Sequence, residues 1–176
     1  NNAAIAARYL ESKGLRVAIL DVDFHHGNGT QDIFYDDPSV LYVSIHGDPR
    51  KFFPWYSGYE DEIGAGKAED TNLNIPLPGG SDKQIYIGAL NRAIEKIVDY
   101  MPDFFLVSLG TDTHIEDPVG KFSLLSQDYH DIGNIISTQL CEKISMTCVI
   151  QEGGYNPRAN LSAVRNFFNG FLDIES

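Results

Sequence analysis

Cysteine is scarce in this chain, and long apolar runs are absent. The 176 residues include two cysteines, Cys141 and Cys148, which do not have Cys-x-x-Cys spacing. This excludes a disulfide-stapled fold and a cysteine-built zinc site, and it predicts reduced thiols in a cytoplasmic protein. Cys148 falls in an apolar run and is expected to be buried. No stretch is typical of a signal peptide or a membrane helix, so no membrane association is expected.

Basic residues are also few, with 13 Lys and Arg against 25 Asp and Glu, a net charge of −12. Nucleic-acid binding needs a basic face, so a nucleic-acid partner is not expected. The acidic surplus either steers cationic substrates or serves solubility, and composition leaves both readings open. Aromatic residues make up 11% of the chain and low-complexity tracts are absent, which predicts one folded domain over residues 1–176.

The chain alternates between strand and helix patterns. This alternation predicts an α/β fold in which a mostly parallel sheet is built with right-handed crossovers. Ser81 followed by Gln84 predicts a capping box, and the apolar stripe Ile87, Leu90, Ile94, Ile97, Val98 and Met101 predicts core packing. The expected helices are 2–13, 30–35, 82–100, 127–144 and 158–172, the expected strands are 16–22, 39–45, 72–76, 103–109 and 146–151, and a long loop is expected at 46–70.

The end of the first predicted strand carries two acids and two histidines, in the order Asp21-Val-Asp23-Phe-His25-His26. Side chains two apart on a strand share a side, so Asp23 and His25 can face a common point. Ligands of parallel sheets gather beyond the carboxyl ends of the strands, where this pair falls. The alternative for an isolated Asp-x-His is a surface turn with two solvated acids.

Two further strand ends add to this pair. The run 104–109 leads to Gly110-Thr-Asp112, and the run 147–151 leads to Glu152-Gly-Gly-Tyr155. Two carboxylates and one imidazole, from Asp23, His25 and Asp112, match a catalytic zinc site with water as the fourth ligand. The oxygen-rich set also suits Fe(II), Mn(II) or Co(II). Tyr155 either hydrogen-bonds a ligand in the cleft or packs beneath a loop.

Taken together, these segments resemble the zinc-dependent deacetylases of the histone deacetylase superfamily, and within it the bacterial acetylpolyamine amidohydrolases. The resemblance implies an arginase/deacetylase-like, three-layer αβα fold in which this chain supplies the last five of eight strands and the N-terminal strands are missing. The matching segments also include Tyr42-Val-Ser44-Ile45-His46, Ser108-Leu-Gly110-Thr-Asp112-Thr-His114-Ile-Glu-Asp117-Pro118, Phe52-Phe-Pro-Trp-Tyr-Ser-Gly-Tyr59, Gly64-Ala-Gly66-Lys-Ala and Asn74-Ile-Pro-Leu-Pro-Gly-Gly80.

The resemblance also implies roles for individual residues. Asp23, His25 and Asp112 fall on the zinc ligands, Tyr155 on the donor to the substrate carbonyl, and Asp21 on the acid that orients a catalytic histidine. Zinc-activated water would release acetate from an acetylpolyamine, another small cationic acetylated amine or an acetyl-lysine peptide. A monovalent cation, usually potassium, would be bound by Asp21, Asp23, His25, Ser44 and Ile45, and a second cation would touch Phe34, Asp37, Val40 and Thr71.

The chain departs from the family in its histidines, because the catalytic pair of the family lies upstream of Asn1. None of the five histidines replaces it: His26 is expected to pack, His46 to line the cleft, His114 to make a loop contact, and His130 to be exposed or half-buried. The chain alone is therefore expected to be weak or inactive. The predicted strand 146–151 would lose a neighbour and leave an open edge, which predicts a homo-oligomer or aggregation.

Two other functional readings remain open. The missing histidines leave room for a non-catalytic binding or regulatory remnant. A binuclear manganese ureohydrolase needs an acid two residues after the histidine, and Gly27 stands there, which disfavours it. The aromatic residues of the predicted loop 46–70 either line a substrate tunnel or pack the loop against the rest of the domain, and both roles are compatible with the sequence. These residues are Phe52, Phe53, Trp55, Tyr56 and Tyr59.

Overall fold

In the part of the chain that the structure describes, five strands form a parallel sheet in the order β3-β2-β1-β4-β5. The computed structural model describes residues 1–141, 143–144 and 146–174. The five strands that the family resemblance implies are therefore neighbours in one sheet. The strands are β1 (Val17–Asp21), β2 (Val40–Gly47), β3 (Asn72–Leu77), β4 (Phe104–Leu109) and β5 (Thr147–Gln151).

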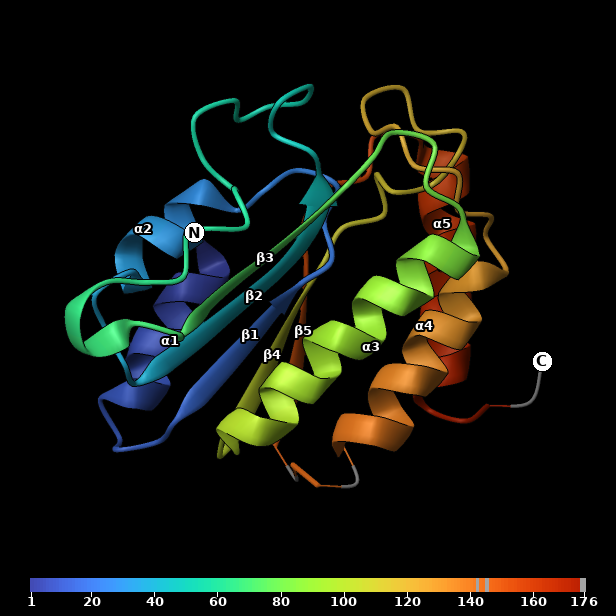
Figure 1. The fold of residues 1–176 in the computed structure, drawn as a ribbon. Helices are drawn as coiled ribbons and strands as arrows, with labels where there is room; N and C mark the ends of the chain where they lie inside the picture. Colours follow the sequence, from blue (N-terminus) through green and yellow to red (C-terminus); the bar gives the residue numbers. More distant parts are fainter. Residues whose placement is uncertain (142, 145, 175–176) are drawn as a thin grey trace.

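Helices cover both faces of this sheet, which gives three layers (Figure 1). On one face lie α1 (Asn2–Glu11) and α2 (Asn28–Phe34). On the other lies α3 (Lys83–Tyr100), beside the packed pair α4 (Asp128–Ile136) and α5 (Pro157–Phe171). The predicted three-layer α/β fold is confirmed. None of the described helices is long and apolar enough to cross a membrane.

The central strand β1 is buried along its whole length, because helices shield both of its faces. A parallel strand in this position is a continuous apolar run rather than an alternating one. Leu20 packs in the larger core with Leu90 and Ile94 of α3, while Ile19 packs in the smaller core with Ala7 of α1. These two cores hold the carboxyl ends of β1 and β4 side by side, with Asp21 paired to Ser108.

Local capping sets where several helices begin. The Asn1 side chain accepts from Ala4 N at 2.9 Å, and Asn156 caps α5 ahead of Pro157 at the first helical position. The predicted capping box at Ser81 and Gln84 is wrong: Asp82 is the cap of α3, and its Oδ1 accepts from Ile85 N at 3.1 Å. The Ser81 hydroxyl instead donates to Pro78 O at 2.7 Å, within the preceding turn.

Two burial predictions are also wrong. Met101 is 71% exposed because it ends α3 in the left-handed conformation, at φ 53°, and so points away from the core. The rest of its stripe is buried or half-buried as predicted. Cys148 is exposed because, in the described part of the chain, β5 pairs only with β4 and forms the edge of the sheet.

The predicted helix 127–144 is shorter in the structure. The α-helix ends at Ile136 and continues as a π-helical turn over Ser137–Cys141, while Glu142 of that prediction lies outside the described residues. The long loop holds a single 3₁₀ turn at Gly66–Ala68. The other elements lie within three residues of their predicted bounds.

Candidate metal centre

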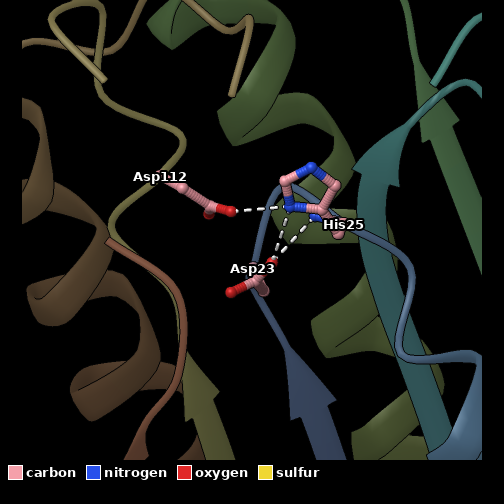
Figure 2. Close-up of side chains that lie close together, drawn as sticks. All are labelled: Asp23, His25 and Asp112. Carbon is pink, nitrogen blue, oxygen red and sulfur yellow. Dashed lines mark hydrogen bonds and ion pairs between the residues drawn. The ribbon is translucent and has the colours of Figure 1, made fainter. Parts of the chain in front are cut away.

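The side chains of Asp23, His25 and Asp112 converge at the carboxyl ends of β1 and β4 (Figure 2). One ligand atom of each lies within 4.8 Å of the other two. His25 Nδ1 is 2.8 Å from Asp112 Oδ2 and 3.5 Å from Asp23 Oδ1. The structure thus brings together three side chains that are separated by up to 89 positions, from residue 23 to residue 112, in the sequence.

Backbone amides hold both carboxylates in orientation. Phe24 N donates to Asp112 Oδ1 at 2.8 Å, and Gly153 N donates to Asp23 Oδ2 at 2.7 Å. In each acid the other oxygen faces the His25 ring. Such outer hydrogen bonds orient metal ligands and strengthen binding, so the donor set is preorganised.

Two glycines leave the space that these carboxylates occupy. A Cβ on Gly153 would lie 2.5 Å from Asp23 Oδ2 and 2.9 Å from Asp112 Oδ2. A Cβ on Gly110 would overlap the Asp23 carboxylate. The strand ends 104–112 and 147–155 therefore need glycine so that the backbone can approach these carboxylates closely.

Electrostatics at the centre favour a cation. Burial raises the pKa of Asp112 to about 6. Burial disfavours a charged His25, but hydrogen bonds to Asp112 and Asp23 outweigh it and raise the pKa of His25 to about 9. Burial also opposes ionisation of Asp23, yet hydrogen bonds from His25 and Gly153 lower its pKa. At neutral pH a proton on His25 thus balances the carboxylates, and a metal ion would have to displace it.

The donor set fits zinc. Two carboxylate oxygens and one imidazole nitrogen could supply the three protein ligands that a catalytic zinc site needs, and they would leave a fourth position open. A cavity of about 330 Å³ lies beside Asp23 and His25, and it is lined in part by Asp21, Asp23, His25, Glu152, Gly153 and Tyr155.

Asp21 lies on this cavity, 5% exposed. Its Oδ2 accepts from Tyr42 Oη at 2.8 Å, and its Oδ1 accepts from Asp23 N at 3.1 Å. Burial and the Asp23 charge raise the pKa of Asp21 well above its usual range. Sequence reasoning missed the Tyr42 contact, although alternation along β2 puts Tyr42 and Ser44 on one side of the strand.

Tyr155 lines the same cavity and is half exposed. Its backbone N–H donates to Asp117 Oδ2 at 2.8 Å, and Gly154 before it has φ 155°. Burial and the charges of Asp23 and Asp112 raise the pKa of Tyr155, so its phenol is protonated at neutral pH. Asp117 therefore positions the backbone at Tyr155, a role that sequence reasoning did not assign.

The remaining histidines lie apart from the centre or in its packing. The prediction that His46 lines the cleft is wrong: it is fully buried, with ring nitrogens bonded to Ser44 Oγ and Gly58 O. His26 is buried and bonded to Gln31, as packing predicts. His114 makes a buried loop contact with Ser126, and His130 is exposed on α4.

The structure also places the residues of the two implied cation sites. Ser44 and Ile45 are fully buried in β2, and Ser44 is paired with Asp21 across the strands. At the second site Asp37 is engaged by other groups, because it accepts from the Ser39 hydroxyl and forms an ion pair with Arg8. Of the other members, Phe34 and Val40 are buried and Thr71 is half-buried.

Fold and site together define a three-layer α/β domain with a candidate metal centre at the carboxyl ends of adjacent parallel strands. The family model of the histone deacetylase domain matches residues 1–171. The chain belongs to the histone deacetylase family.

Relatives by sequence include acetylpolyamine amidohydrolases. Acetylpolyamine amidohydrolase 2 of Pseudomonas aeruginosa is 51% identical over an alignment of 177 positions, which covers 99% of this chain and 50% of that protein. The acetylpolyamine amidohydrolase of Burkholderia pseudomallei is 40% identical, with 97% and 49% covered.

Solved structures agree with this assignment. A crystal structure of acetylpolyamine aminohydrolase from Burkholderia pseudomallei matches with a TM-score of 0.91 at 39% identity, covering 97% of this chain and 49% of that one. A histone deacetylase homologue from Aquifex aeolicus matches with a TM-score of 0.90 at 33% identity, covering 99% and 46%. The chain thus spans about half the length of the relatives that it matches.

Proposed function

We propose that this chain is the metal-holding part of a deacetylase that hydrolyses N-acetylated amines. The observation that carries the proposal is the convergence of Asp23, His25 and Asp112, with one oxygen of each acid fixed by a backbone amide. Small cationic acetylated amines such as acetylpolyamines are the favoured substrates, since the chain is acidic and its relatives carry that name. Acetyl-lysine in a peptide is the second candidate.

Zinc, or Fe(II) in its place, would polarise the acetyl carbonyl and lower the pKa of water at the centre. The protonated Tyr155 phenol is suited to donate a hydrogen bond to the oxyanion that develops from the acetyl carbonyl. In this role it must stay protonated, and its raised pKa keeps it so.

A general base has to take the proton from water, and the described histidines other than His25 are placed for other contacts. His26, His46 and His114 are bonded to Gln31, Gly58 and Ser126, and His130 is exposed on α4. We therefore assign the base to an upstream histidine pair of the family, with Asp21 orienting it. Burial raises the pKa of Asp21, and a nearby cation would offset the cost of its buried charge, which supports a potassium ion bound by groups at Asp21, Asp23, His25, Ser44 and Ile45.

Acetate release tests this proposal. The chain is combined with the upstream half of its 51%-identical Pseudomonas relative, and acetate is measured from an acetylated diamine with and without zinc. We expect zinc-dependent release from the combination and none from either half. Binding of zinc without any release would favour the non-catalytic alternative, and two bound metal ions per chain would favour the ureohydrolase.

The edge strand supports a further proposal, self-association of this chain alone. Among the described residues β5 has one strand neighbour, and Cys148 within the strand and Met146 just before it are exposed. Open edges pair with other chains. We expect a dimer or larger species by light scattering at high concentration, and a monomeric mass there would contradict the proposal.

A further inference from the structure

The loop 48–65 between β2 and the 3₁₀ turn contains neither helix nor strand along its described residues. Buried side chains of β3 hold its backbone instead. Asn72 Nδ2 donates to Glu62 O at 2.6 Å, and Asn74 Nδ2 donates to Tyr59 O at 3.1 Å. The loop also closes on itself, because Gly58 N donates to Glu62 Oε2 at 2.8 Å. Its shape is therefore fixed by polar side chains and not by a strand ladder.

A single amide, that of Gln31 on α2, lies at the centre of these contacts and is 6% exposed. Its nitrogen donates to Glu62 Oε2 at 2.6 Å and to Ser57 Oγ at 3.1 Å, both in the loop. Its oxygen accepts from Asn72 Nδ2 at 2.9 Å, Asn74 Nδ2 at 2.8 Å and His26 Nε2 at 3.1 Å. The amide orientation is set, because donors surround its oxygen and acceptors its nitrogen.

Gln31 also connects the loop to the metal centre. Its partner His26 directly follows the ligand His25, and the His26 ring lies 4.6 Å from the His46 ring. Gly58 of the loop fits against both rings, since a Cβ there would lie 2.8 Å from each. The loop is thus packed onto the segment that carries two of the three ligands.

On the outside, the same loop exposes aromatic side chains. Phe53 is 48% and Trp55 is 62% exposed, and their rings meet edge to face at 5.6 Å between centroids. Phe52, in contrast, packs inward on Phe24, which itself contacts the His25 ring. The inner side of the loop is therefore packed against Phe24, and Phe53 and Trp55 are exposed on its outer side.

We infer that Gln31 is a positioning residue that fixes the loop 48–65 against the metal centre and so places Phe53 and Trp55 for the amine chain of the substrate. The substrate step rests on the proposed function, whereas the fixing of the loop does not. Gln31 would thus influence specificity through the loop, without itself contacting the substrate or the metal.

The structural arm of the test uses Gln31→Glu. This change keeps the shape of the Gln31 side chain and its accepting oxygen. It replaces the donating nitrogen with a carboxylate oxygen, which then faces Glu62 Oε2. We expect hydrogen exchange of the loop amides 55–64 to rise about tenfold while β1 and β4 are unchanged. Trp55 is the single tryptophan, and its fluorescence anisotropy should fall. Asp32→Asn, an exposed acid next to Gln31 on α2, is the matched control and should change neither readout.

A reversed pair provides the rescue. In Gln31→Glu/Glu62→Gln the donor comes from the loop and the acceptor from α2, so loop exchange should return to within about threefold of the parent. Glu62→Gln alone should raise hydrogen exchange of the loop as Gln31→Glu does. It replaces Gln31→Glu in the test if that variant does not fold. Unchanged loop exchange in these single variants, or a uniform rise across the sheet, would overturn the inference.

The kinetic arm uses the recombined enzyme described above. For an acetylated diamine we expect Gln31→Glu to raise KM about tenfold with kcat within about threefold of the parent. For a short acetamide KM should be unaffected, and zinc affinity should be unchanged. Equal losses for both substrates would overturn the specificity role. If the parent releases no acetate, the proposed function fails, while exchange and anisotropy still decide whether Gln31 fixes the loop.

Discussion

Replacing Asp112 by asparagine is expected to lower the zinc affinity of this chain at least about a hundredfold. Asparagine keeps an oxygen for the Phe24 N–H, so the local backbone is retained. It removes the charge, however, and can turn an amide donor toward His25 where Asp112 Oδ2 now lies. Calorimetry on metal-stripped protein measures the effect. Asp99→Asn, an exposed acid on α3, is the control and should bind zinc like the parent.

The same titration carries a pH signature. The pKa of His25 is about 9 without metal, so His25 is protonated at neutral pH and zinc must displace that proton. The free protein binds more protons than the zinc complex, so affinity should rise with pH, about tenfold per unit from pH 6.5 to 8.5. Asp112→Asn removes one partner that raises the pKa and should flatten this dependence. If the folded parent protein binds no zinc, the proposal that the zinc site is preformed is wrong.

Replacing Tyr155 by phenylalanine is expected to lower kcat of the recombined deacetylase by two to three orders of magnitude. Loss of one oxyanion donor costs roughly 3–4 kcal/mol in the transition state. KM and zinc affinity should change little, because the phenol is not among the three ligands and its backbone contact with Asp117 is kept. Acetate-release kinetics and a parallel zinc titration measure both quantities.

Tyr9→Phe serves as the control for this experiment, since Tyr9 is exposed on α1 and should leave kcat unchanged. An unaltered kcat in Tyr155→Phe would remove the phenol from the reaction. A fall in zinc affinity equal to the fall in kcat would instead make Tyr155 a support of the metal centre.

The meeting of Asp23, His25 and Asp112 follows from local patterns, whereas the number of strands that this chain supplies was implied by the family resemblance. Apolar runs that end in Asp-x-His and in Gly-Thr-Asp place these side chains at one edge of a parallel sheet, and the structure has this arrangement. Met101 and Cys148 were misplaced because their burial depends on where a helix stops and on which strand is outermost. Neither property is encoded in a short window of sequence.

The contacts of His46 and Gln31 were beyond local patterns for a related reason. His46 is buried because the loop folds back over it and Gly58 O reaches its ring. Gln31 meets asparagines of β3 that lie more than 40 positions away. One local signal was present: Asn72 and Asn74 alternate within a strand that is otherwise apolar, and polar residues at that period inside a core require partners.

The hydrogen bond from Gly153 N to Asp23 Oδ2 spans 130 positions and ties the segment after β5 to the end of β1. Neither the Asp23 nor the Asp112 carboxylate keeps its orientation if β4 and β5 separate from β1, so the candidate metal centre is expected to form only with the folded sheet. A metal that binds the folded state alone adds about 4 kcal/mol to its stability when present at a thousand times its dissociation constant. Zinc supply would then govern the fraction of chains that are folded.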